Sequence, residues 1–211
     1  MKAIRLSAAI LALGLVATPV AAQLAGQPAY AIPKGVGLGL NLDFGMQLDP
    51  SVTGGSNNLA ARVTLGLPMI KFTAAFQPAV LDNETPGGES RVMAGAAIQL
   101  MPMPVSVRLQ ANVGYGMDSK DIALNPGVVI GLNVPSPAIS VEPWIMPAFR
   151  YRRNDAAGTS TSGFGVSAGV NLGLPGGIGG HVGLDYDADA EVFTGGLGLH
   201  YTLSIPGLGM M

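Results

Sequence analysis

Residues 36–48 read VGLGLNLDFGMQL, and the period of two in this stretch decides the fold. Apolar side chains occupy every second position, and glycine or polar residues fill most of the positions between them. Successive side chains of a β-strand point to opposite faces of a sheet, whereas a helix repeats its apolar residues roughly every 3.6 positions. The stretch therefore predicts a strand with one apolar face and one small or polar face.

The same alternation recurs along the chain in segments of similar length. The ten segments cover residues 36–48, 59–67, 70–79, 91–101, 105–117, 122–134, 139–152, 163–174, 178–187 and 192–203. Tight, proline-marked breaks alternate with polar breaks at 49–58, 82–90, 118–121, 154–162 and 188–191. Short turns at one end and longer loops at the other are typical of a transmembrane barrel. We predict an all-β fold, a closed antiparallel barrel of ten strands, with eight strands as the alternative.

Charged residues are scarce, and those within the predicted strands lie on one face. Charged residues make up 11% of the chain, against about a quarter in an ordinary soluble domain. Within the ten segments they fall on the small or polar face, at Asp43, Arg62, Lys71, Arg91, Arg108, Glu142, Arg150, Arg152, His181, Asp185, Asp187 and His200. A cation facing lipid at mid-bilayer costs about 2–4 kcal/mol, so the apolar face is predicted to meet lipid.

Aromatic residues on the apolar face lie near the ends of the predicted strands. Those toward the loops are Tyr115, Phe149, Tyr151, Phe164, Tyr186 and Phe193, and those toward the turns are Phe72 and Tyr201. Aromatic rings favour the interface between membrane and water. Their placement therefore predicts the same membrane orientation as the lengths of the connections.

The composition excludes several other classes. The chain has no cysteine, so it has no disulfide, thiolate metal site or catalytic thiol. Its net charge of −2 provides no basic surface for nucleic acid. Residues 1–22 combine Lys2 and Arg5 with an apolar stretch and the small residues Ala21 and Ala22, which predicts a cleaved secretory signal peptide. Residues 23–34 are interpreted as a linker that leads into the barrel.

The alternating segments, the segregated charges and the aromatic ends resemble the small outer-membrane β-barrel proteins of Gram-negative bacteria, the opacity and porin-like group. The resemblance implies a barrel over residues 35–205, located in the cell outer membrane. It implies outer-membrane lipid, lipopolysaccharide and the barrel-assembly machinery as partners, and no cofactor. Such proteins usually end on an aromatic residue, whereas this chain continues into a C-terminal tail, residues 206–211.

The inward face supplies the candidate functional residues. We expect the lumen to be lined by Asp43, Arg62, Lys71, Arg108, Glu142, Trp144, His181, Asp185 and His200. Their charges either neutralise one another or form a constriction that selects ions; pairing is favoured because unpaired buried charges are costly and ten strands enclose a modest space. Inward glycines leave room, particularly in 163–173 and 179–183.

No metal or catalytic site is predicted. If the last hairpin turns at Asp189 and Ala190, His181 and His200 become diagonal neighbours without a third ligand. The acidic run from Asp185 to Glu191 is interpreted as a solvated loop, with a weak Ca²⁺ site as the alternative. A nucleophile, base and orienting group are not found together, so we expect no enzyme.

The predicted function is that of a porin-like or structural protein which allows at most narrow passive diffusion of small solutes. The alternative is a surface adhesion or binding module that acts through loops 49–58, 82–90 and 154–162. These loops contain few aromatic or arginine residues that could anchor a partner.

Overall fold

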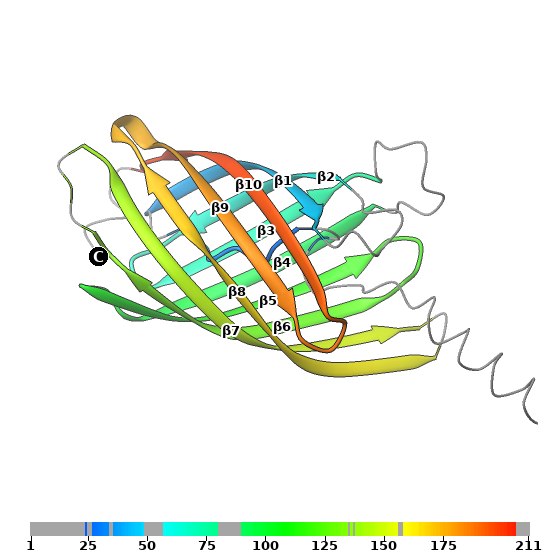
Figure 1. The fold of residues 1–211 in the computed structure, drawn as a ribbon. Helices are drawn as coiled ribbons and strands as arrows, with labels where there is room; N and C mark the ends of the chain where they lie inside the picture. The colour runs from blue at the N-terminus through cyan, green and yellow to red at the C-terminus, as the bar shows by residue number, and fades with distance from the viewer. Residues whose placement is uncertain are drawn as a thin grey trace, which may run out of the picture.

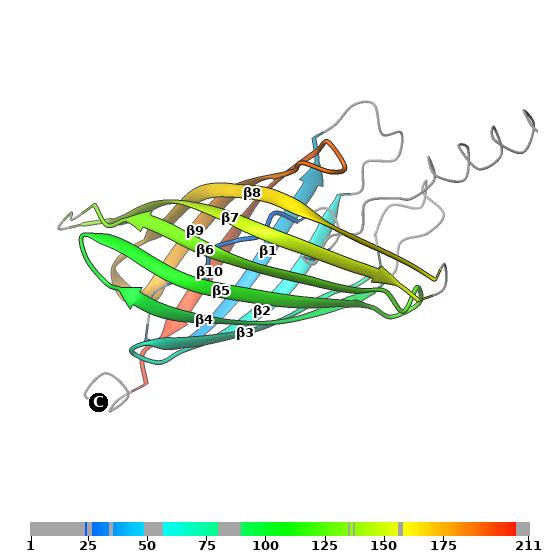
Figure 2. The same ribbon diagram turned by 90° about the horizontal axis from the view of Figure 1, so that it is seen from below.

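The segments with a period of two form β-strands, and neighbouring strands pair in antiparallel order (Figures 1 and 2). The computed structural model describes residues 24, 27–33, 36–48, 57–79, 90–134, 136, 138–155 and 158–205. Its strands are β1 (Gly37–Gln47), β2 (Asn58–Gly66), β3 (Ile70–Gln77), β4 (Arg91–Met101), β5 (Val105–Gly116), β6 (Ile122–Leu132), β7 (Ser140–Asn154), β8 (Thr159–Gly173), β9 (Ile178–Asp187) and β10 (Val192–Leu203). The predicted signal peptide and C-terminal tail lie outside these residues.

The first and last strands close the sheet into a barrel. In β1, Asn41 pairs with Arg62 of β2 on one side and with His200 of β10 on the other. Every strand then has two neighbours, which removes the unpaired edges of an open sheet. The prediction of a closed ten-stranded antiparallel barrel is confirmed.

The connections define two ends of the barrel. We call the end with connections 67–69, 102–104, 133–139 and 174–177 the short-turn end, and the opposite end the loop end. At the loop end, the lengths of connections 117–121, 155–158 and 188–191 fall within the range of the turn lengths, whose longest member is 133–139. The predicted difference in length therefore rests on connections 48–57 and 78–90, most of which lie outside the described residues.

The prediction of a loop over residues 154–162 is wrong. Strand β7 continues to Asn154, and β8 already begins at Thr159, which is its direct partner. Further pairs join Arg153 to Ser160 and Arg152 to Thr161. Serine and threonine look like loop residues in a sequence, but β-branched threonine also fits a strand, and a hairpin ladder carries both. The β7–β8 hairpin therefore extends to a connection of only four residues, 155–158.

The outer surface of the barrel is apolar on every strand. Exposed apolar side chains include Leu40, Val63, Phe72, Ile98, Leu109, Ile130, Ile145, Val166, Val182 and Leu197, one on each strand. Among the described strand residues the only fully exposed charge is Arg153, at the loop end, where it pairs with Asp155 at 2.6 Å. This is the inverse of a soluble sheet, whose charged face meets water. It is the surface of a barrel that crosses a lipid bilayer.

The ladder between β6 and β7 is interrupted by prolines. Leu124 pairs with Tyr151 and Gly127 with Ala148, but the register omits the pairs that would contain Pro126 and Pro147. It also omits the pair that would contain Pro143. Proline has no backbone N–H to donate, so each one removes a ladder hydrogen bond.

Candidate functional site

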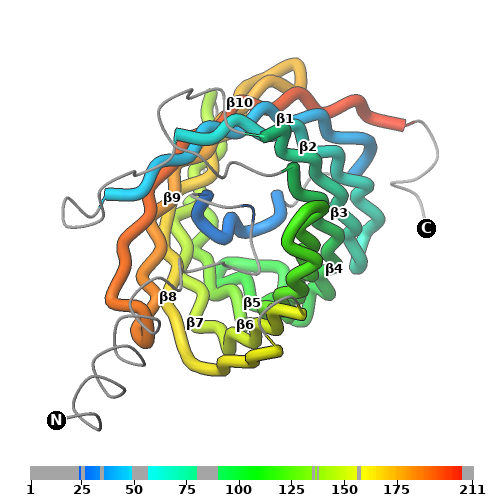
Figure 3. The backbone as a smooth tube through the Cα atoms, turned by 90° about the vertical axis from the view of Figure 1, so that its right-hand side faces the viewer, coloured from blue at the N-terminus to red at the C-terminus, as the bar shows by residue number. Residues whose placement is uncertain are grey.

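The N-terminal segment lies inside the barrel. Residues 27–33, drawn in blue in Figure 3, run through the ring of strands. The side chains of Ala31 and Ile32 are each 1% exposed. The sequence predicted only a linker over residues 23–34, and nothing in its composition indicated a position in the lumen.

The direction of this segment is set by its two ends. Pro33 lies with Gly37, Gly66 and Thr202, at the short-turn end. Leu24 packs with Ala60, Ala75 and Met93, each of which is two residues from the loop end of its strand. The segment therefore runs antiparallel to β1, from the loop end toward the short-turn end. We call residues 27–33 the plug.

Strand β5 binds the backbone of the plug. The Gln110 side-chain amide donates to the carbonyl oxygen of Tyr30 at 2.9 Å and accepts from the N–H of Ile32 at 3.0 Å. Arg108 Nη1 donates to the carbonyl oxygen of Ile32 at 2.5 Å. The carbonyl of one residue and the N–H of the residue two further on point to the same side of an extended chain. Gln110 therefore binds the plug as a neighbouring strand would.

Tyr30 is the largest side chain of the plug, and four strands enclose it. Its ring packs edge-on against His181 with a centroid distance of 4.5 Å, and Arg62 lies over the ring at 5.2 Å. Its hydroxyl donates to the carbonyl oxygen of Phe44 at 3.3 Å. A Cβ atom at Gly183 would lie 3.1 Å from the ring, and one at Gly196 would lie 2.2 Å from the hydroxyl oxygen. The tyrosine side chain therefore fills the space that these two inward glycines leave open.

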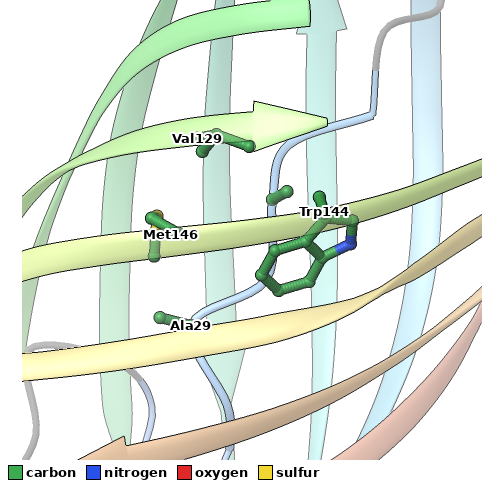
Figure 4. Packing of buried hydrophobic residues seen from close by; sticks show 5 residues of the cluster. Ala29, Val129, Trp144 and Met146 are labelled. Carbon is green, nitrogen blue, oxygen red and sulfur yellow. The ribbon is translucent and has the colours of Figure 1, made fainter. Parts of the chain in front are cut away.

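The alanines of the plug contact an apolar wall. Ala29 and Ala31 form one buried cluster with Val129, Trp144 and Met146 of β6 and β7 (Figure 4). Trp144 was predicted to line the lumen, and it is 4% exposed. Small plug residues thus lie against large wall residues.

The other end of the plug is fixed through Gln27. Its side-chain amide donates to the carbonyl oxygens of Asp43 at 3.2 Å and Asn58 at 3.0 Å. A cavity of about 20 Å³ remains between this part of the plug and the wall. That volume is enough for about one water molecule.

The charges expected in the lumen pair with one another. Asp43 binds Arg62 at 2.9 Å and lies 2.8 Å from His181 Nε2. Glu142 binds Arg108 at 2.8 Å and accepts from Ser106. Of the two alternatives drawn from the sequence, this geometry corresponds to mutual neutralisation.

A second ionic cluster lies nearer the loop end. Arg150 binds Asp185 at 2.6 Å and lies 3.5 Å from Asp187, which also pairs with Arg152. Ser167 donates to Asp185. Arginines already bind these two carboxylates, so they do not form the ligand set of the Ca²⁺ alternative. In the part of the chain that the structure describes, no three histidine, cysteine or acidic side chains converge as a metal site would require.

The remaining predicted residues are Lys71 and His200. Lys71 is buried near the short-turn end, where its ammonium donates to the carbonyl oxygen of Leu67 at 3.2 Å. His200 stacks on His181 with a centroid distance of 6.0 Å, as expected of diagonal neighbours, and each histidine is opposite a glycine. Gln110, which the sequence did not single out, makes two hydrogen bonds to the plug.

No helix among the described residues is long and apolar enough to cross a membrane.

No protein-family model and no curated protein matches the sequence. Among solved structures, the chain is similar to the β domain of the Bordetella autotransporter BrkA, at 10% identity over 80% of this chain and 100% of that chain, with a TM-score of 0.49. It is similar to the KdgM porin, solved in complex with disordered oligogalacturonate, at 8% identity over 78% and 99% of the two chains, with a TM-score of 0.45. A de novo designed transmembrane β-barrel gives 16% identity over 82% and 100%, with a TM-score of 0.42. What identifies this chain as a transmembrane barrel is its own closed register and apolar outer surface.

Proposed function

We propose that the protein is a porin-like barrel of the Gram-negative outer membrane whose lumen is held closed by its own plug. The observation that carries this proposal is the burial of residues 27–33 within the ring of strands, with hydrogen bonds to wall residues on both sides. While the plug is in place, the barrel passes at most water and the smallest solutes. The proposal includes no catalytic step.

The location rests on the predicted signal peptide, residues 1–22, together with the apolar outer surface. The even number of strands puts the start of β1 and the end of β10 at the short-turn end of the barrel wall, which we assign to the periplasmic side. The loop end then faces the cell exterior. Outer-membrane lipid and lipopolysaccharide surround the barrel, and the barrel-assembly machinery inserts it.

The alternative, a surface binding module, receives less support from the structure. It depended on loops 49–58, 82–90 and 154–162. Most of the first two lies outside the described residues, and most of the third is strand.

Single-channel recording in planar bilayers tests the proposal. One protein is the full mature chain, and the other carries a glycine–serine segment of the same length in place of residues 27–33. We expect the unaltered chain to give no conductance steps and the altered chain to give small, discrete ones, because the altered segment loses the Tyr30 ring and its contacts with the wall. Arg153→Ala, which changes only an exposed ion pair, serves as the control and should remain closed.

Equal conductance of the two chains would contradict the proposal. Migration of the unheated protein on a gel shows whether each variant is folded, because a closed barrel migrates differently before and after heating. A folded glycine–serine variant without conductance would show that the wall itself closes the lumen.

A further inference from the structure

The contacts that hold the plug are of a kind that could hold a separate peptide. Gln110 and Arg108 bind only the backbone of residues 30–32, through three hydrogen bonds. Such contacts recognise an extended chain whatever its side chains, as strand addition does in peptide-binding proteins. The backbone contacts therefore fix the position of an extended peptide relative to β5 but do not select its amino-acid sequence.

Sequence preference comes from the space around Tyr30. The ring occupies the gap left by Gly183 and Gly196, between His181 and Arg62. The carbonyl oxygen of Phe44 accepts from its hydroxyl. A guanidinium over an aromatic face is a favourable contact, and the hydroxyl acceptor distinguishes tyrosine from phenylalanine. The pocket therefore favours a tyrosine side chain.

The residues on both sides of the tyrosine must be small. Ala29 and Ala31 are buried against Trp144, Val129 and Met146. Larger side chains at these two positions would overlap with a wall that is already packed. The lumen thus distinguishes a pattern of small residue, tyrosine, small residue in an extended chain.

We propose that the lumen wall of β1, β2, β5–β7, β9 and β10 is a binding site for an extended peptide with a tyrosine between two small residues, and that the plug is its resident occupant. This inference rests on the proposed function, because it treats residues 27–33 as an occupant that can leave. A tether of a few residues holds an occupant at an effective concentration of about a millimolar. A peptide in solution therefore has to approach that concentration to displace the unaltered plug, and binds at a lower concentration where the resident plug is weakened.

Tryptophan fluorescence reports directly on whether the lumen is occupied. Trp144 is the single tryptophan, and it contacts the plug in the buried cluster. Its emission should shift to longer wavelength when the plug withdraws and water reaches the indole, and should shift back when a peptide refills the lumen.

The experiment uses the full mature chain with Tyr30→Ala, refolded in detergent micelles. The probe is a synthetic peptide with the sequence of residues 27–33, and Trp144 emission is followed as the peptide is added. We expect the peptide to restore the emission of the unaltered chain with a midpoint at or below about a millimolar, because the weakened plug competes less well than the unaltered one. The same peptide with alanine in place of tyrosine should need at least about tenfold more, and the unaltered chain should not respond.

A pair of wall variants in the Tyr30→Ala chain separates recognition from general stability. Gln110→Ala removes two hydrogen bonds to the peptide backbone and should weaken binding about tenfold. Leu109→Ala is the matched control, because the neighbouring Leu109 side chain faces outward and is 46% exposed. It should leave the midpoint unchanged.

The possible outcomes distinguish this inference from the proposed function. If Tyr30→Ala does not fold, the glycine–serine variant takes its place; if neither folds, the plug is an integral part of the barrel and the inference is overturned. It is also overturned if a folded variant shows no tyrosine-dependent change in emission up to about 10 mM peptide, roughly tenfold above the expected midpoint. Peptide binding without any conductance would instead contradict the proposed function alone, and conductance without peptide binding would contradict only the inference.

Discussion

Two parts of the barrel wall contact the same plug and are built in opposite ways. On β9 and β10, Gly183 and Gly196 leave space for the Tyr30 ring beside His181. On β6 and β7, the inward positions that face the alanines are Val129, Trp144 and Met146. We call the first the glycine wall and the second the apolar wall. The extended plug alternates large and small side chains, and each wall complements the side that it contacts.

The two walls also differ in their backbone ladders. The glycine wall is paired at successive positions from Val192↔Asp187 to Tyr201↔Ile178. The apolar wall lacks the pairs that would contain Pro126, Pro143 and Pro147. The interrupted ladder lies where large inward side chains pack, and the complete ladder lies where glycines occupy the central inward positions. Side-chain packing therefore takes the place of backbone hydrogen bonds at the interrupted positions of this barrel.

The largest expected effect is the loss of the apolar wall's central side chain. Trp144→Ala removes a buried indole from contact with the plug alanines and should lower the free energy of unfolding by about 3–5 kcal/mol. Urea unfolding of the full chain in lipid vesicles measures this change. The control on the other side of the barrel is His200→Ala, which removes a half-buried ring outside the apolar cluster. An equal decrease in the free energy of unfolding for both variants would show that the apolar wall does not contribute more to stability than other parts of the lumen.

A smaller effect is expected when the glycine wall receives a side chain. In Gly183→Leu the new Cβ would lie 3.1 Å from the Tyr30 ring and 3.4 Å from Pro28. Overpacking of this kind should cost about 1–3 kcal/mol in the unaltered chain. The cost should fall below about 0.5 kcal/mol when the glycine–serine segment replaces residues 27–33, because the clash is with the plug.

The matched control for this pair is Gly173→Leu. A Cβ at Gly173 meets only Ser140, at 3.4 Å, and does not approach the plug. Its effect should be the same in both chains. If Gly183→Leu is equally destabilising with and without the plug, then Gly183 is required by the wall itself and the complementarity with Tyr30 is not the reason for the glycine.

The strands could be predicted from the sequence because the membrane imposes a rule on each of them separately. Lipid penalises a charge on the outer face wherever it occurs, so the phase of each strand can be read locally. The register of the last hairpin was equally predictable, and Tyr186 does stack on Phe193. The β7–β8 hairpin was underestimated because residues 159–162 are serine and threonine, and beyond the lipid the alternation of polarity is no longer imposed.

The plug could not be predicted in this way, because its position depends on a match between distant residues. The pattern Pro28-Ala29-Tyr30-Ala31-Ile32 does alternate in size, but it is too short to indicate a structural element. Its partners Gly183 and Gly196 lie more than a hundred residues later in the chain. The sequence did indicate that inward glycines leave room in the lumen; it did not indicate what fills that room.

The smallest expected effect concerns the ladders themselves. Each ladder hydrogen bond contributes about 0.5–1.5 kcal/mol, so backbone amides near the prolines should open more readily than those of the glycine wall. We expect Val128, opposite Pro147, to exchange its amide hydrogen up to about tenfold faster than Val182, which pairs with Leu197. Both side chains lie on the outward phase of their strands, Val128 half-buried and Val182 exposed, and NMR of the folded barrel in micelles gives both rates. Equal protection at the two positions would mean that inward packing of Trp144 and Met146 holds the interrupted ladder as firmly as hydrogen bonds hold the complete one. The two walls would then differ in their inward side chains and ladder hydrogen bonds but not in local stability.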